Sequence, residues 1–303
     1  MCGIVGLLVK KPALKEHLGA WMVPMMLGMT ERGPDSAGLA VFGDAVDERL
    51  RKLSLYSGLT AEGALFDWSA LVTGLNATMP AARASAQPTG NHAILTVAID
   101  PDAVKLWLKE LHPKLHILST GRSIDLYKDI GTPGEVAARY GFESLQGTHL
   151  VGHTRMATES AVTPDRAHPF TAGEDFCLVH NGSLSNPYGV RRKLEPLGIH
   201  FDTDNDTEAA CRFIEWRLRD GDDLPTALQR SFNELDGFYT LLMGTADQLA
   251  LIRDPFACKP AMVAETDDYV AIASEFRALA HLPGINHAHV FEPAPEEMYV
   301  WKA

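Results

Sequence analysis

The feature that most constrains the fold is a wholly apolar run at residues 2–9, CGIVGLLV. A strand with one face in water alternates apolar and polar residues. An unbroken apolar run therefore predicts a strand that is covered on both of its faces.

The remaining elements follow from periodicity and turn residues. Further strands are predicted at 39–42, 149–155, 176–182, 238–243, 249–254, 261–265, 269–275 and 297–301. Apolar residues at helical spacing predict a helix from about Leu14, which Pro24 should kink or restart, and helices at 207–219 and 224–235. Two stacked sheets with helices outside them would accommodate this order, so we expect an α+β fold.

The middle of the chain, residues 44–146, reads differently. It contains an Ala-rich stretch of low complexity at 77–90. A predicted strand at 92–99, a helix at 100–111 and a strand at 115–120 follow. We therefore expect 44–146 to hold a small inserted α/β subdomain, to which the sequence assigns no function.

Composition and charge argue against several classes of protein. The 303 residues carry 27 Lys+Arg and 39 Asp+Glu, a formal net charge of −12, which argues against a nucleic-acid partner. Gly, Pro or charge breaks every long apolar run, so we expect no membrane segment. The apolar run precedes the first lysines, opposite to a secretory signal, which favours a cytoplasmic protein. The four cysteines show no CxxC spacing, so neither a disulfide scaffold nor a zinc site is expected.

Cys2 is the most informative single residue. An initiator methionine is normally removed when a small residue follows it, and removal would give Cys2 a free α-amine. Such an amine has an ordinary pKa of about 8, so it is a base poised near neutral pH on the same residue as the thiol. A nucleophile with an adjacent base is the arrangement of covalent catalysis. Taken alone, Cys2 could equally be a chance cysteine in an apolar strand.

Three polar clusters add to this. Arg155 ends the segment GHTR, and a guanidinium suits bidentate binding of a carboxylate, although a surface salt bridge is the alternative. Asn181 and Gly182 follow an apolar run and form either a tight turn or an oxyanion hole. The acidic run 202–208 contains good helix caps and could also hold an ammonium group. It lacks the Gly and the distant Glu of a calcium loop.

One substrate needs the whole set. A nucleophile with an oxyanion hole acts on an amide, an Arg binds a carboxylate and an Asp binds an amine. An α-amino acid with a side-chain amide carries all three groups, and glutamine is the obvious candidate.

At this point the sequence resembles the class II glutamine amidotransferases, of the N-terminal-nucleophile hydrolase superfamily. The matching motifs, in the family's order, are MCGIVG, RGPDSAG, GHTRMAT, HPF, HNG, DNDTE, LDGFYTLL, RDPFACKP and IASE. The resemblance implies a four-layer αββα sandwich over residues 2–303, with 44–146 as an insert within it.

The resemblance also implies residue roles. Cys2 is expected to be the nucleophile and, through its amine, the general base, with Asn181 and Gly182 as the oxyanion hole. The expected substrate-binding residues are Arg155 for the α-carboxylate, Asp206 for the α-amino group, Arg32 to position the N-terminus, and His180 and Thr158. His153 and His180 match the motifs in a structural rather than a catalytic capacity. The segment 156–169 is expected to close over bound glutamine.

Within the family, the opening motifs most resemble the amidotransferase subunit of N-methylglutamate synthase, used in methylamine metabolism. This resemblance implies separate glutamate-synthase-like subunits as partners, since the chain ends near the end of the amidotransferase domain. No phosphate loop, dinucleotide fingerprint or iron–sulfur pattern is present, so no cofactor is expected. The alternatives are a stand-alone hydrolase of another γ-glutamyl amide and a non-catalytic assembly subunit.

Overall fold

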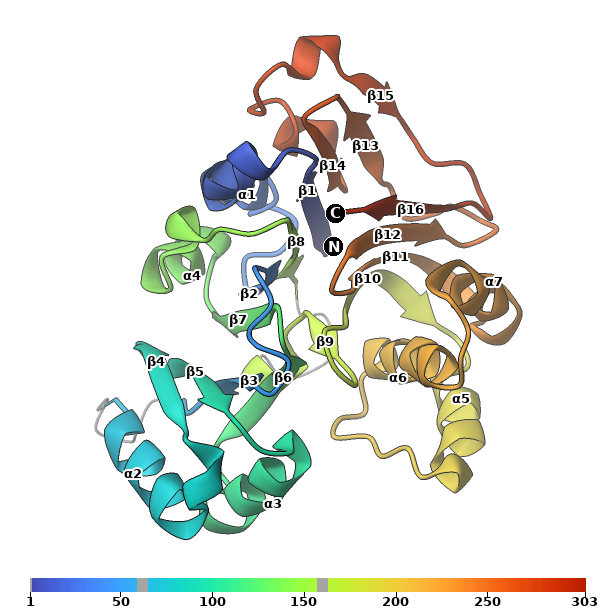
Figure 1. Ribbon diagram of the computed structural model, residues 1–303. Coiled ribbons are helices and arrows are strands. Elements are labelled where there is room, and N and C mark those ends of the chain that lie inside the picture. The colour runs from blue at the N-terminus through green and yellow to red at the C-terminus, as the bar shows by residue number, and fades with distance from the viewer. Residues whose placement is uncertain (1, 59–64, 157–162) are drawn as a thin grey trace.

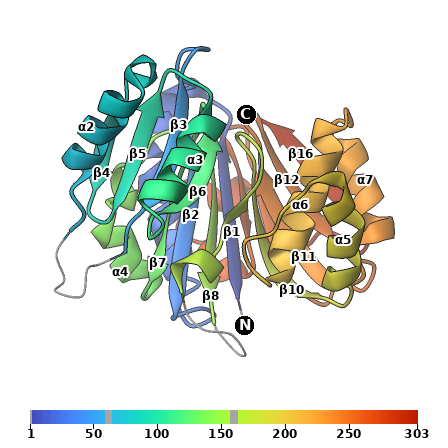
Figure 2. The same cartoon turned by 90° about the horizontal axis from the view of Figure 1, so that it is seen from below.

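The computed structural model describes residues 2–58, 65–156 and 163–303. Within these residues, two main sheets are stacked face to face between two layers of helices, and a smaller sheet lies beside them (Figures 1 and 2). The layers confirm the expected α+β, four-layer αββα sandwich. The helices are α1 (Leu18–Leu27), α2 (Trp68–Thr78), α3 (Pro101–Leu111), α4 (Pro133–Arg139), α5 (Pro187–Leu194), α6 (Asp206–Arg219) and α7 (Leu224–Glu234).

The first main sheet has the strand order β15-β13-β14-β1-β8-β2-β7, with every neighbouring pair antiparallel. Its strands are β1 (Gly3–Val9), β2 (Ser36–Phe42), β7 (Ile124–Ile130), β8 (His149–Arg155), β13 (Met262–Glu265), β14 (Tyr269–Ala273) and β15 (His289–Phe291). The run predicted at residues 2–9 is therefore the central strand, between β14 and β8.

The second main sheet has the order β16-β12-β11-β10-β9. Its strands are β9 (Phe170–Thr171), β10 (Cys177–Leu184), β11 (Gly237–Gly244), β12 (Gln248–Arg253) and β16 (Met298–Lys302). Both C-terminal hairpins predicted from the sequence are present, β11 with β12 and β13 with β14.

Three apolar cores fill the three interfaces between the layers, and β1 contributes to two of them. Val5 and Leu7 point toward α1, in the core between the first sheet and its helices. Ile4 and Leu8 belong to the core between the two sheets. Both faces of β1 are therefore buried, which is why this strand carries no alternating polar residues.

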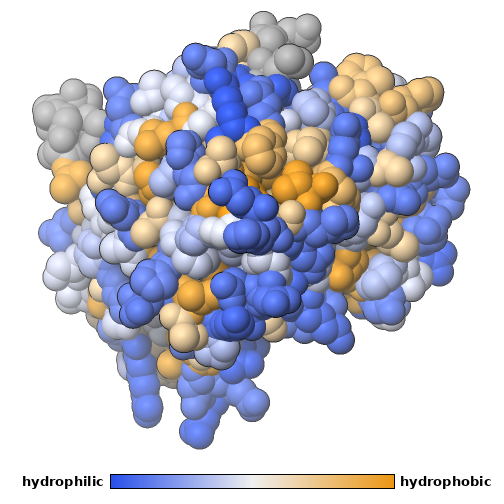
Figure 3. Space-filling view, turned by 90° about the horizontal axis from the view of Figure 1, so that it is seen from above, coloured by the Kyte–Doolittle hydropathy of each residue, from blue (hydrophilic) through white to orange (hydrophobic). Residues whose placement is uncertain are grey.

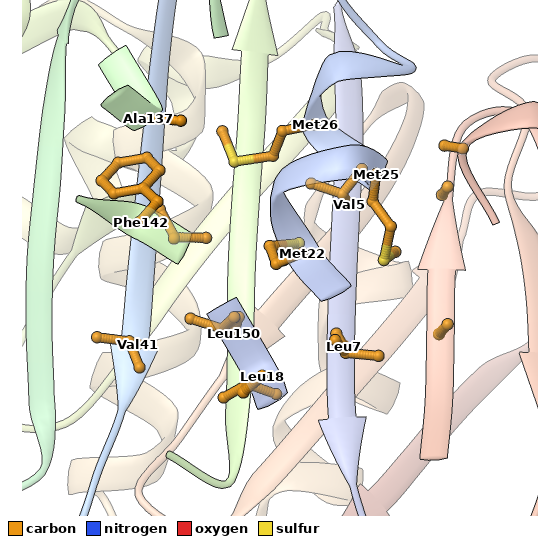
Figure 4. Close-up of a cluster of buried hydrophobic side chains, with 14 of the residues drawn as sticks. Val5, Leu7, Leu18, Met22, Met25, Met26, Val41, Ala137, Phe142 and Leu150 are labelled. Atoms are coloured by element: carbon orange, nitrogen blue, oxygen red, sulfur yellow. The ribbon is translucent and has the colours of Figure 1, made fainter. Parts of the chain in front are cut away.

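The first helix begins later than predicted. A 3-10 turn spans Pro12–His17 and α1 starts at Leu18. α1 then continues past Pro24 to Leu27 instead of restarting there. Its methionines Met22, Met25 and Met26 pack over β1 and β8, as Figure 4 shows. Flexible thioether side chains suit this surface because they fill irregular gaps against the sheet.

The smaller sheet has the order β4-β5-β3-β6 and carries α2 and α3. Its strands are β3 (Arg51–Tyr56), β4 (Ser85–Thr89), β5 (His92–Val97) and β6 (His116–Gly121). The predicted strand–helix–strand unit is β5, α3 and β6. The interval 44–146 also contains β7, which pairs with β2 in the first main sheet, and α4, which packs on β2. The separate sheet thus accounts for only the part of this interval from β3 to β6.

In the described residues, no helix is both long and apolar enough to cross a bilayer. The face in Figure 3 mixes hydrophilic residues with hydrophobic patches of limited extent.

Candidate active site

Cys2 lies immediately before β1 and is half-buried. The strand that follows it is held on both sides: Gly3 pairs with Thr154 of β8, and Ile4 exchanges two hydrogen bonds with Ser274. Ile4 N donates to Ser274 Oγ at 3.0 Å, and Ser274 N donates to Ile4 O at 3.0 Å. The backbone next to the candidate nucleophile is therefore rigidly placed.

Arg32 fixes Cys2 itself. Its Nε donates to Cys2 O at 3.1 Å, and its Nη1 contacts Glu275 Oε1 at 2.7 Å. The Arg32 side chain is only 9% exposed, whereas that of Glu275 is 33% exposed, so the ion pair is partly shielded from water. A Cβ on the adjacent Gly33 would lie 2.2 Å from Thr154 C, so only glycine lets this turn approach β8.

Arg155 is the last residue of β8, between β1 and β2, and it is 6% exposed. Its carbonyl accepts from Asp35 N at 3.0 Å. Arg155 therefore leaves the same end of the first sheet as Cys2, because Gly3 and Thr154 are register partners.

Asn181 and Gly182 come from the other main sheet. β10 continues through them to Leu184, so they do not form a turn at the end of the strand. Asn181 is 2% exposed, and its Nδ2 has no hydrogen-bond partner within the described residues. Gly182 has φ +144°, and a Cβ there would lie 2.1 Å from Phe238 O. The Asn181 amide is therefore a buried donor without a partner among the described residues, as one of the donors of an oxyanion hole would be, and Gly182 admits no side chain.

Asp206 is the first residue of α6, after the N-cap Asn205. Its Oδ2 accepts from Leu184 N at 2.9 Å, and its Oδ1 lies 3.7 Å from His180 Nδ1. Burial pushes the pKa of Asp206 up, but hydrogen bonding and charge from His180, with the backbone N–H groups, outweigh it and lower the pKa to about 2. The carboxylate is therefore ionised at neutral pH and can attract a cation.

His180 belongs to a buried group that the sequence analysis did not assemble. His168 Nε2 lies 2.8 Å and His180 Nδ1 3.1 Å from Thr207 Oγ1, and His153 Nε2 lies 3.1 Å from His180 O. The signal was present, because His168 is in the HPF motif and Thr207 in DNDTE, but only the folded chain brings them together.

Thr158 lies outside the described residues, as does part of the segment 156–169 expected to close over the substrate. Closer to β9, Arg166 contacts Asp204 Oδ1 at 3.1 Å, which joins this segment to the acidic run before α6. No group of three or more possible metal ligands occurs in the ranges that the structure describes.

A groove of about 630 Å³ lies elsewhere, between α3 and β6 of the smaller sheet and β9 and α6 of the main body. Its lining contains none of the site residues named from the sequence. The candidate site takes residues from both main sheets: Cys2, Arg32 and Arg155 from the first sheet and its flanking turns, and Asn181, Gly182 and Asp206 from the second sheet and its helix. The contact of His153 Nε2 in β8 with His180 O in β10, at 3.1 Å, joins the two sheets beside these residues.

Comparison with known proteins agrees with this chemistry. The family described as "Glutamine amidotransferase domain" matches residues 153–281. "Glutamine amidotransferase-like protein GlxB" of Rhizobium meliloti is 44% identical over 302 residues, which cover 99% of this chain and 98% of that protein. A "Putative glutamine amidotransferase" of Methanothermobacter thermautotrophicus is 31% identical over 309 residues, covering 99% of each.

Solved structures show the same fold. The glutamine phosphoribosylpyrophosphate amidotransferase from B. subtilis, complexed with ADP and GMP, matches 99% of this chain and 47% of its own, with TM-score 0.62 and 19% identity. The structure titled "allosteric regulatory enzyme of purine biosynthesis" matches 99% and 46%, with TM-score 0.63 and 19% identity. This chain thus spans about half the length of both, while it spans nearly all of the two relatives above.

Proposed function

The chain belongs to the class II glutamine amidotransferases, and on that premise we propose that it hydrolyses L-glutamine to L-glutamate and ammonia through a γ-glutamyl thioester on Cys2. The observation that carries the proposal is the contact between the two main sheets beside these residues, where His153 Nε2 of β8 lies 3.1 Å from His180 O of β10. The first sheet contributes a nucleophile and a buried arginine, and the second sheet and α6 contribute an amide donor without a partner and a carboxylate.

The proposed reaction has two steps. The α-amine of mature Cys2 accepts the thiol proton, and Sγ attacks the side-chain amide carbon of glutamine. Asn181 Nδ2 and Gly182 N–H donate to the oxygen that becomes negative. The ammonium of Cys2 returns the proton to the leaving nitrogen, so ammonia departs and the thioester remains. Water, deprotonated by the same amine, then attacks the thioester and releases glutamate.

The proposed recognition assigns one protein charge to each charged end of glutamine. Arg155 binds the α-carboxylate and Asp206 binds the α-ammonium, while Arg32 and Glu275 hold Cys2 in place. Because Asp206 is ionised at neutral pH, it offers the charge that an ammonium needs. His180 and Thr158 complete the proposed substrate-binding set.

We further propose that a cytoplasmic complex uses the nitrogen. Separate glutamate-synthase-like subunits would supply the acceptor site, with N-methylglutamate synthesis from methylamine and glutamate as the reaction. The support for this assignment is the resemblance of the opening motifs. Purification of the tagged chain from its native host, with an assay of N-methylglutamate formation, tests it. Copurified subunits that transfer nitrogen to another acceptor would refute the assignment without touching the glutaminase proposal.

The glutaminase proposal is tested with Cys2→Ala, and Cys258→Ala is the matched control because Cys258 is exposed and free. Release of ammonia from glutamine should fall at least about 1,000-fold in Cys2→Ala, because the nucleophile is lost, and stay unchanged in the control. Wild-type activity in Cys2→Ala would refute the mechanism. Intact-mass measurement should show that Met1 is absent from the active protein, since a retained methionine would remove the proposed base.

A further inference from the structure

We propose that Thr207 is the centre of a buried hydrogen-bond network, with His168 and His180, that positions the Asp206 carboxylate for the substrate ammonium. This inference rests on the proposed glutaminase function and assigns Thr207 and His168 as positioning residues.

The network is buried and compact. Thr207 is 0% exposed, and its hydroxyl lies 2.8 Å from His168 Nε2, 3.1 Å from His180 Nδ1 and 3.5 Å from Asp206 Oδ1. The His153 and His168 rings stack with their centroids 4.1 Å apart. All three histidines are at most 5% exposed, so water does not compete for these contacts.

His168 is held independently of Thr207. Lys128 Nζ donates to Ala167 O at 2.8 Å and to Pro169 O at 3.2 Å, on either side of His168. A Cβ on Gly38 would lie 2.0 Å from His168 O, so the glycine of the RGPDSAG motif lets this backbone approach β2. The imidazole is therefore presented to Thr207 by a fixed backbone.

The positions of the ring protons on the histidines determine which atom donates in each hydrogen bond of this network. Burial lowers the pKa of His153 to about 3 and that of His168 well below its usual value, so both rings are neutral at pH 7. His153 Nε2 faces the carbonyl of His180, so it carries the proton. The ring nitrogens His153 Nδ1, His168 Nδ1 and His180 Nε2 have no hydrogen-bond partner among the described residues.

One arrangement leaves no N–H unpaired. His168 Nε2–H and His180 Nδ1–H donate to Thr207 Oγ1, which has two lone pairs, and the hydroxyl proton points to Asp206 Oδ1. The three nitrogens without a partner then carry lone pairs and no proton. Burying an unpaired lone pair costs less free energy than burying an N–H group without an acceptor.

The consequence for binding is that hydrogen bonds hold both oxygens of the Asp206 carboxylate, Oδ2 from Leu184 N and Oδ1 from the Thr207 hydroxyl. With Leu184 N on Oδ2, the carboxylate is oriented yet keeps its full negative charge. A buried lysine or arginine would also keep Asp206 ionised, but it would cancel the charge that an ammonium recognises. A hydroxyl donor therefore suits a site that must bind a cationic group.

The test uses Thr207→Val, which keeps the shape but lacks the hydroxyl, and Thr207→Ser as the matched variant that restores it. KM for glutamine should rise about tenfold or more in Thr207→Val and return near wild type in Thr207→Ser, because a hydrogen bond to a charged group is lost and regained. Hydrolysis of 4-carbamoylbutanoate, which is glutamine without its α-amine, should change less than about threefold. An equal loss with both substrates, or no loss with glutamine, would overturn the inference.

A double-mutant cycle checks that the effect passes through Asp206. In an Asp206→Asn background, Thr207→Val should cause little further rise in KM for glutamine. A full additional rise would show that Thr207 acts on the site by another route.

A measurement of the histidine tautomers by ¹⁵N NMR tests the network independently of activity. In protein labelled with ¹⁵N-histidine at pH 7, we expect the Nε2–H tautomer for His168 and the Nδ1–H tautomer for His180. Thr207→Val should shift both signals and leave His149, which contacts Thr245 O at 2.9 Å, unchanged as the control. The opposite tautomers would overturn the network. A wild-type protein that shows these tautomers but does not hydrolyse glutamine would refute the proposed function alone.

Discussion

Both the backbone conformation and the close packing at position 182 require glycine. Its φ of +144° favours glycine, and a Cβ would lie 2.1 Å from Phe238 O, 2.8 Å from Tyr239 Cα and 3.0 Å from His180 Nε2. A side chain here would displace either β11 or the imidazole of His180. The position therefore couples the proposed oxyanion hole to the network behind Asp206.

For this reason, Gly182→Ala should lower kcat for glutamine hydrolysis by about 100-fold, since the backbone donor would move from the developing oxyanion. Gly198→Ala is the matched control, because Gly198 also has a positive φ, +80°, but no atom within 4 Å of its Cβ position. The control should lose about 1 kcal/mol of stability and no activity. Steady-state kinetics and urea unfolding separate the two effects. Equal kcat in both variants would contradict the role of Gly182.

At this scale the sequence predicted the chemistry of the site better than its surroundings. Cys2 and Arg155 were named because each residue type matches one group of glutamine, and the family resemblance pointed to Asp206 within the acidic run. Ser274 and Glu275 were seen only as parts of a motif, since their contacts with Ile4 and Arg32 join residues more than 240 positions apart. Such contacts leave no periodic signal in the sequence.

Among the elements, β1 joins the buried core to the candidate active site, because Cys2 lies immediately before it. Its apolar pattern was enough to predict burial on both faces, and the structure confirms it between α1 and the second sheet. The apolar pattern does not predict which strands flank β1. In the structure these are β8, which ends in Arg155, and β14, which is followed by Ser274 and Glu275.

Ser274→Ala tests whether the end of β1 must be held. Ser274 is 1% exposed, and its loss leaves Ile4 N without the acceptor at 3.0 Å, two residues from Cys2. We expect a loss of about 1–3 kcal/mol in the free energy of unfolding and about a tenfold fall in kcat.

Ser231→Ala is the matched control, since Ser231 is also buried but donates to Leu228 O within its own helix, α7. Denaturant unfolding and kinetics should show a stability effect without a change in kcat. If Ser274→Ala keeps full kcat despite lower stability, the position of β1 does not limit catalysis.

Across the whole molecule, Asp129 joins the smaller sheet to the main body. This carboxylate of β7 is contacted by Tyr56 of β3 at 3.3 Å, by Arg139 at 2.6 Å and by the hydroxyl of Tyr140. Tyr140 also contacts Asn91, in the turn before β5, at 2.5 Å. Burial acts to raise the pKa of Asp129, but these donors outweigh it and lower the pKa. The network therefore fixes the smaller sheet against β7.

Tyr140→Phe removes the hydroxyl that contacts both Asp129 of β7 and Asn91 beside the smaller sheet. We expect a loss of about 1–3 kcal/mol in the free energy of unfolding and faster hydrogen exchange in β3 and β5. Tyr188→Phe, at an exposed position, should change neither. Unchanged exchange in β3 and β5 of Tyr140→Phe would show that other contacts hold the smaller sheet.

Buried histidines make the stability of the molecule depend on pH. Burial lowers the pKa of His92 to about 3, of His149 to about 4 and of His153 to about 3, from an ordinary value of 6.5. At a pH between the lowered pKa values and 6.5, the unfolded chain binds more protons than the folded one. Stability is therefore full above about pH 6.5 and falls as the pH drops toward 4, by up to about 1.4 kcal/mol per pH unit for each histidine.

His149→Gln should reduce that slope by about one proton. His281→Gln, at an exposed position, is the control and should keep the wild-type slope. Urea unfolding between pH 7 and pH 5 measures both. A slope unchanged in His149→Gln would mean that this ring is not neutral in the folded state.

The sequence by itself determined the elements and the chemical groups of this protein. Apolar periodicity predicted the double burial of β1 and the helices α6 and α7, and residue types matched to glutamine, with the family resemblance, indicated the candidate site. Only the tertiary structure decided that β7 and α4 pack with the first main sheet and not with the smaller one, and that Thr207 joins His168 and His180 beside Asp206. The physical reason is range: periodicity records which face of an element is buried, whereas strand order and polar networks depend on contacts between segments far apart in the chain.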